Sequence, residues 1–250
     1  MLPLETVVFL VIGAVLGGFV MGLVGFGTGL VALGFWLFVT EPALAVPLVA
    51  CCSLATTAFT LGAYRHAIVP SRLAPLFAGA IVGLPLGVIL LTRLDAGIFK
   101  VAMGLFLVAY TLFRLLVLPG LTLRPRGRAA DIGVGFASGI LSGFASIPGP
   151  LTTVWAGLRG WSKDEQRAVY QPFNQLLLLL ALGLFGWQGL LTWELAKAAA
   201  YCVPAALAAM AVGMMFYKRL DDAQFQRIVL LLLLASGIML VVLNGLAAAT

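Results

Sequence analysis

Charged residues are scarce in this chain of 250 amino acids. Asp, Glu, Lys and Arg together make up 10% of the sequence, whereas 62% is hydrophobic and the mean hydropathy is +1.13. A water-soluble domain has about 25% charged residues, so this composition excludes a water-covered surface over most of the chain. No stretch is polar enough to form a soluble domain of its own.

Patterns of catalytic and metal-binding residues are missing as well. The sequence has one histidine, His66, and no HExxH motif. Its nine acidic residues lie near the ends of apolar runs rather than within them, so an intramembrane hydrolase would lack its nucleophile and base. We therefore expect no enzyme activity, no cofactor and no metal site. The net charge of +6 comes from bases at segment ends, which is typical of lipid contact and not of nucleic-acid binding.

Long uncharged runs are what the sequence has instead. A membrane-spanning helix needs about 20 apolar residues. Runs of this length cover 6–40, 42–64, 73–92, 132–158, 168–193, 198–217 and 228–250, and a shorter run, 101–113, continues past Arg114 to Leu123. These runs predict an all-α polytopic membrane protein with about eight transmembrane segments.

The two halves of the chain repeat. The stretch "GVILLTRLDAGIF" at 87–99 matches "GMMFYKRLDDAQF" at 213–225 with an offset of 126. Further upstream the offset is 121, which places Gly18 and Gly22 on Gly139 and Gly143. Duplication of this kind is common in transporters. We expect a first transmembrane repeat at 1–118, a basic cytoplasmic linker at 119–131 and a second transmembrane repeat at 132–250.

The first segment of each repeat is interrupted. As a single helix, the 35 residues of run 6–40 would be about 52 Å long, against a hydrocarbon core of about 30 Å. Glycine breaks a helix most cheaply, so we expect a break within Gly22–Gly29, and the second segment carries Pro148, Gly149 and Pro150 at the matching place. A nucleotide-binding loop is excluded because no strand precedes the glycines.

The distribution of Lys and Arg indicates that each interrupted segment is a helical hairpin. Eight single crossings would divide these residues seven against eight, which is no bias. Two hairpins, each returning to the side from which it entered, leave only Arg93, Lys100 and Lys197 on one face and twelve on the other, as the positive-inside rule requires. Both termini are then outside, loops 64–72, 114–131, 159–167 and 218–227 are cytoplasmic, and the repeats are inverted.

The hairpin tips are the expected binding site. The helices that resume near Thr28 and Leu151 begin with unpaired N–H groups and a partial positive charge, which favour an anion. The candidate tip residues are Gly25, Gly27, Thr28, Gly29, Ser142, Ser146 and Gly149. Candidates for the walls are Ser53, Thr56 and Thr57 in the segment after the first hairpin, and Gln171, Asn174 and Gln175 in the matching segment of the second repeat.

Other glycines are expected to have a packing role. Gly13, Gly17, Gly18 and Gly22, like Gly135, Gly139 and Gly143, follow the small-xxx-small pattern that brings membrane helices close together. Gly83 lies on an ordinary span, so we expect it to tolerate alanine.

The glycine motifs "GLVGFGTGL" and "SGILSGFASIPGPL", the eight apolar segments and the chain length resemble the TauE/SafE sulfite exporter family, also called the 4-toluene sulfonate uptake permease family. The resemblance covers about 5–246. It implies a secondary transporter of small sulfur-containing anions, such as sulfite, thiosulfate or organosulfonates, in the bacterial inner membrane. Pro148 stands where the family pattern has a glycine, which bears on the substrate more than on the fold.

Two further hypotheses stay open, a carrier of another small solute and a membrane assembly partner that transports nothing. Coupling to protons follows only from the resemblance, with Glu41, beside the first hairpin, and Glu165, near the second, as the candidate carriers. The sequence does not specify an oligomeric state.

Overall fold

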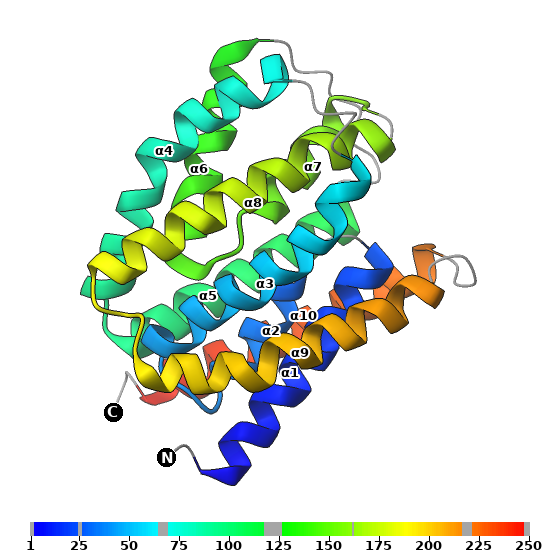
Figure 1. The fold of residues 1–250 in the computed structure, drawn as a ribbon. Coiled ribbons are helices and arrows are strands. Elements are labelled where there is room, and N and C mark those ends of the chain that lie inside the picture. Colours follow the sequence, from blue (N-terminus) through cyan, green and yellow to red (C-terminus); the bar gives the residue numbers. More distant parts are fainter. Residues whose placement is uncertain are drawn as a thin grey trace.

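The computed structural model describes residues 3–24, 27–64, 70–117, 127–161, 163–216 and 222–247. Within these ranges every regular element is helical, as the composition predicts (Figure 1). The elements are α1 (Leu4–Val24), α2 (Thr28–Trp36), α3 (Pro42–Tyr64), α4 (Pro70–Arg93), α5 (Ala96–Leu112), the π-helical turn η2 (Phe113–Val117), α6 (Arg128–Ala145), α7 (Gly149–Leu158), α8 (Lys163–Trp187), α9 (Trp193–Phe216) and α10 (Asp222–Ala247).

Six of these helices are long and apolar enough to cross a membrane, namely α1, α3, α4, α5 with η2, α8 and α9. Helix α10 contains a shorter apolar stretch, Leu233–Asn244. The chain is therefore a polytopic α-helical membrane protein, while the count of eight segments stays a prediction.

Both predicted interruptions are present. Helix α1 ends at Val24 and α2 begins at Thr28, and α6 ends at Ala145 before α7 begins at Gly149. With 9 and 10 residues, α2 and α7 are about 14–15 Å long at 1.5 Å per residue, too short to cross the hydrocarbon core. The second helix resumes two residues earlier than predicted, because Pro148 and Pro150 fit the first turn of a helix, where no N–H is needed.

Each short helix folds back antiparallel on the helix before it. The indole Nε1 of Trp36, at the end of α2, donates to the carbonyl oxygen of Leu10 at 2.9 Å. A Cβ at Gly17 would lie 2.7 Å from the carbonyl oxygen of Thr28, at the start of α2. In the second half, Trp155 of α7 donates to Asp131 in the first turn of α6. The segments α1–α2 and α6–α7 are thus helical hairpins.

Glycine stripes join each hairpin to a distant helix. Helix α1 packs along α9 and α6 packs along α4. A Cβ at Gly18 would overlap the carbonyl oxygen of Ala206, and one at Gly139 that of Ala80. Gly22, Gly135 and Gly143 lie at such contacts too, whereas Gly13 and Gly17 face α2 within the first hairpin. The packing prediction for these glycines is confirmed.

The expectation that Gly83 tolerates alanine is wrong. A Cβ at Gly83 of α4 would overlap the carbonyl oxygen of Phe136 on α6 and lie 3.0 Å from the amide nitrogen of Ile140. Gly79 and Gly87, one turn before and one turn after it, meet Ile132 and Ile140 in the same way. Helix α4 is therefore the partner of the second hairpin, a role that the sequence alone did not indicate.

The arrangement surrounds a pair of central helices. Helices α3 and α8 pack against each other. In each of them, 61% of the apolar stretch that is long enough to span a membrane is buried inside the protein. In Figure 1, α4 and α6 run from the upper end of the molecule towards the lower left, while α1 and α9 run the opposite way. Helix α1 begins and α10 ends at the same lower end of the bundle. The two hairpins therefore enter the bundle from opposite ends.

Candidate functional site

The first hairpin tip is built on a left-handed glycine. Gly27 has φ 105° and ψ 0°, a conformation that glycine adopts without steric cost. The carbonyl oxygen of Gly27 accepts the N–H of Val31 at 3.1 Å, which starts α2. The preceding N–H groups, from Thr28 to Leu30, have no acceptor within the helix, and the N-cap residue Gly27 has no side chain that could cap them. This tip thus presents backbone donors.

The second tip uses a serine and two prolines. Ser146 ends α6 in the left-handed conformation, with φ 57°. Its N–H donates to Ser142 at 2.9 Å, and the N–H of Ile147 donates back to Leu141 at 3.4 Å, which closes the helix in the manner of a Schellman cap. Because Pro148 and Pro150 have no N–H, Gly149 is the first residue of α7 to offer one.

The two tips meet in the structure. A Cβ at Gly29 would lie 2.6 Å from Cγ2 of Ile147 and 3.3 Å from the carbonyl oxygen of Ser146. Between them lies a cavity of about 40 Å³, room for about three water molecules. Its lining consists of Met21, Gly27, Thr28, Gly29, Leu30, Ser53, Thr57, Ser146, Ile147, Pro148, Gly149, Pro150, Gln171, Asn174 and Leu178.

Most of the residues singled out in the sequence lie around this cavity. Those that line it are Gly27, Thr28, Gly29, Ser53, Thr57, Ser146, Gly149, Gln171 and Asn174. The tips contribute five of them, and the central helices α3 and α8 contribute the other four, because Ser53 and Asn174 sit at mid-helix beside the tips. The role of these residues in binding stays a prediction.

Other candidates lie outside the lining. Thr56 is buried behind Thr28, with their hydroxyl oxygens 3.4 Å apart, and it donates to the carbonyl oxygen of Cys52 at 2.9 Å. Ser142 is buried one turn before Ser146. Gly25 lies outside the described residues.

The two candidate coupling acids are also away from the cavity. Glu41 is exposed and precedes the first turn of α3, three turns before Ser53. Glu165 pairs with Arg72 at 2.9 Å between the partly exposed first turns of α8 and α4.

Several cavity atoms lack a hydrogen-bond partner. Among the described residues, the hydroxyl oxygen of Ser146 and the side-chain oxygens of Gln171 and Asn174 are buried with none. Gln171 and Ser146 are each 1% exposed and Asn174 is 7% exposed. Buried polar atoms are normally paired, so three unpaired ones around one cavity indicate a place for a polar ligand or water.

A link between the central helices borders the cavity. The hydroxyl of Thr57 on α3 contacts Oε1 of Gln175 on α8, and it also donates to the carbonyl oxygen of Ser53 at 2.6 Å. A hydroxyl has one proton, and amide oxygen and nitrogen can be exchanged by a flip. The arrangement is satisfied when the Thr57 proton goes to Ser53 and the Gln175 amide nitrogen donates to Thr57.

The cavity is electrically neutral apart from the backbone. The described residues that line it include no Asp, Glu, Lys, Arg or His. The N-termini of α2 and α7 supply a local positive field, and each helix terminus stabilises an anion by about 0.3–1 kcal/mol, or up to about 2 kcal/mol when partly buried. The described residues hold no group of His, Cys, Asp or Glu that could bind a metal ion.

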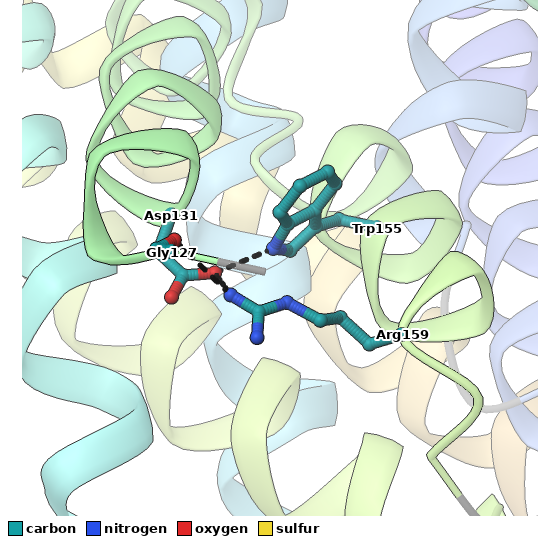
Figure 2. Close-up of polar contacts among 4 residues, drawn as sticks. All are labelled: Gly127, Asp131, Trp155 and Arg159. Atoms are coloured by element: carbon teal, nitrogen blue, oxygen red, sulfur yellow. Dashed lines mark hydrogen bonds and ion pairs between the residues drawn. The ribbon is translucent and has the colours of Figure 1, made fainter. Parts of the chain in front are cut away.

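A polar cluster ties the open end of the second hairpin. Figure 2 shows Asp131 of α6 facing Trp155 of α7 and Arg159, the residue that follows α7. One carboxylate oxygen of Asp131 accepts the indole N–H at 2.7 Å and pairs with Nη2 of Arg159. The Arg159 guanidinium also lies 5.3 Å from the centre of the Trp155 ring. These contacts hold α7, and hence Gly149, in register with α6.

Sequence reasoning missed parts of this arrangement. The apolar lining residues Met21, Leu30, Ile147 and Leu178 had no distinguishing signal in a chain that is 62% hydrophobic. The partnership of Asp131 and Arg159 was missed because both were assigned to loops. One signal in the sequence for this pair is that Asp131 and Arg159 lie at the two ends of the same interrupted segment.

The comparisons with known proteins gave one match. The model of the family described as "Sulfite exporter TauE/SafE" matches residues 10–240. No curated protein and no solved structure matched significantly.

Proposed function

Because the chain belongs to the TauE/SafE sulfite exporter family, we propose that it is a secondary carrier that binds small sulfur-containing anions between its two hairpin tips. The family is one of membrane transporters, so the chain is a multi-pass membrane protein with a small-solute substrate and no expected enzyme activity. Sulfite, thiosulfate and organosulfonates are the proposed substrates, and the bacterial inner membrane is the proposed location.

One observation carries the proposal. Two short helices, α2 and α7, begin at the same cavity, and the cavity holds unpaired buried oxygens of Ser146, Gln171 and Asn174. Helix starts attract anions, and non-helical backbone at membrane depth is tolerated only where it is buried or lines a cavity. A site made of backbone N–H and neutral side chains binds an anion moderately, which favours turnover.

The packing of the hairpins supports the proposed inverted repeat. Helix α1 of the first half packs along α9 of the second, and α6 of the second packs along α4 of the first. Such an exchange is expected when 1–118 and 132–250 are related by a pseudo-twofold axis in the membrane plane. Most of the linker 119–131 lies outside the described residues. Proton coupling through Glu41 or Glu165 stays a prediction.

Transport by the purified protein tests the function. In proteoliposomes, we expect saturable movement of labelled sulfite and of a small sulfonate, and none of a cationic amine. Acetate serves as a control for anions in general. Movement of the amine alone would favour a carrier of another solute. No movement under any gradient by folded protein would favour a non-transporting assembly partner.

Orientation is a separate prediction. The division of Lys and Arg predicts that both termini are outside and that loops 64–72, 114–131, 159–167 and 218–227 are in the cytoplasm. We expect a periplasmic reporter fused after Thr250 to be active and one inserted at Gly127 to be inactive. A cytoplasmic C-terminus would contradict the proposed topology without affecting the cavity.

A further inference from the structure

The groups around the cavity favour a ligand that both donates and accepts hydrogen bonds. The backbone N–H groups at the starts of α2 and α7, with the hydroxyl of Thr28, are donors for anionic oxygens. The unpaired oxygens of Gln171 and Asn174 are acceptors. A ligand without a proton to donate leaves these carbonyl oxygens buried and unsatisfied, at a cost in affinity of about tenfold for each one.

A flip of the Asn174 carboxamide does not remove this requirement. Turning the Asn174 amide exchanges its oxygen and its NH₂ group, but both remain in the same buried place. The Asn174 amide nitrogen is already at the tip, since a Cβ at Gly149 would lie 3.1 Å from it. A ligand with both kinds of group therefore satisfies the Asn174 carboxamide in either orientation.

The total charge of the ligand is limited as well. The desolvation cost of an ion rises steeply with its charge, and none of the lining residues that the structure describes is cationic. Two helix N-termini offset the dehydration of one negative charge in part. They do not offset the much larger cost for two charges in a cavity of about 40 Å³.

We propose that the site selects an oxyanion that carries a single negative charge and one acidic O–H, in preference to dianions and to monoanions without an O–H. This inference rests on the proposed function and specifies the ionisation state of its substrate. For sulfite, the bound species is the hydrogen sulfite ion. For thiosulfate, which is a dianion near neutral pH, we expect weaker binding.

Any pH dependence of binding then comes from the titration of the ligand and not of the protein. On the helices that line the cavity and at their ends, the titratable side chains that the structure describes are Glu5, Glu41, Cys51, Cys52, Arg128, Asp131, Arg159, Glu165 and Tyr170, and none of them lines it. A permanently ionised sulfonate, tested in parallel, reports any titration of the protein itself.

Methylphosphonate and methanesulfonate are matched probes. They have nearly the same size, and in a mildly acidic buffer both are monoanions, but only methylphosphonate carries an O–H. We expect methylphosphonate to raise the Tm of the detergent-purified protein at about tenfold lower concentration than methanesulfonate. Above the second pKa of methylphosphonate this advantage falls about tenfold per pH unit, while the effect of methanesulfonate stays constant.

Substitution of Asn174 and Gln171 tests whether their carboxamides cause the preference for a ligand with an O–H. Asn174→Leu and Gln171→Met together remove both acceptors, and we expect the double variant to lose the tenfold preference for methylphosphonate. Because this probe has one O–H, each single variant keeps one carboxamide that accepts it and retains the preference. The comparison of the two probes on the unaltered protein does not depend on either variant. Asn244→Leu is the control, because this amide bonds the carbonyl oxygen of Leu240 within α10 at 2.9 Å and does not line the cavity.

The outcomes separate the two proposals. Equal or tighter binding of methanesulfonate, or tighter binding of the methylphosphonate dianion, would overturn the selection for an O–H monoanion and leave the anion carrier intact. Binding of neither probe, and of no sulfur oxyanion, by folded protein would overturn the proposed function itself.

Discussion

Replacing Gly149 by leucine lowers the rate of anion transport at least about a hundredfold, while the protein still inserts and purifies. A Cβ at this position would lie 3.1 Å from the amide nitrogen of Asn174, and the rest of the side chain would occupy a cavity of about 40 Å³. Misplacement of a bound substrate by about 1 Å is enough for a loss of this size. The measurement is uptake by proteoliposomes at matched protein content.

Gly157 is the matched control on the same helix. It is exposed, and a Cβ there would meet nothing within 4 Å, so Gly157→Leu retains transport. Gly27 is less suitable than Gly149 for this substitution. Its φ of 105° would strain the backbone of any residue with a side chain, even where the cavity has room for that side chain. Full activity of Gly149→Leu, with normal folding, would show that the substrate binds elsewhere.

Replacing Gly83 by alanine lowers the Tm of the purified protein by roughly 2–12 °C. The added Cβ overlaps the carbonyl oxygen of Phe136, and backbone cannot move aside as a flexible side chain can, so α4 and α6 must separate. Overpacking costs about 1–3 kcal/mol, and each kcal/mol corresponds to about 2–4 °C in a chain of this size. Thermal unfolding in detergent measures the effect.

Gly133→Ala is the control for helix propensity and composition. Gly133 lies on α6, where a Cβ would meet nothing within 4 Å, and alanine forms helix better than glycine. We expect its Tm to be unchanged or slightly higher. A Gly83→Ala protein as stable as this control would mean that α4 and α6 do not touch through their backbones.

The sequence by itself determined the class of protein and the places where its helices break. Too few charges to cover a water-facing surface leave only a membrane protein, and a break near Gly27 or Pro148 follows from the chemistry of single residues. The class of protein follows from the composition of the whole chain, and each break follows from the residues at that place. Neither depends on which helices are neighbours. The same holds for the packing role of Gly18 and Gly139, because the small-xxx-small spacing is visible within one helix.

Only the tertiary structure decided which faces meet. Thr56 and Thr57 are adjacent in the sequence, yet Thr57 lines the cavity and Thr56 lies behind Thr28. Successive residues of a helix point about 100° apart, so their surroundings depend on where the neighbouring helices lie. Gly83 looked ordinary for the same reason, since its partner Phe136 is on a helix 53 positions further along the chain (136 − 83).

The cavity itself is also a tertiary feature. The sequence predicted two separate tips, but the contact of Gly29 with Ile147 depends on hairpins that enter from opposite ends and are held at the right depth. The pairing of α1 with α9 and of α4 with α6 sets that depth. Glycine allows two helix backbones to come into contact. Which helices make that contact is determined by the packing of the whole bundle.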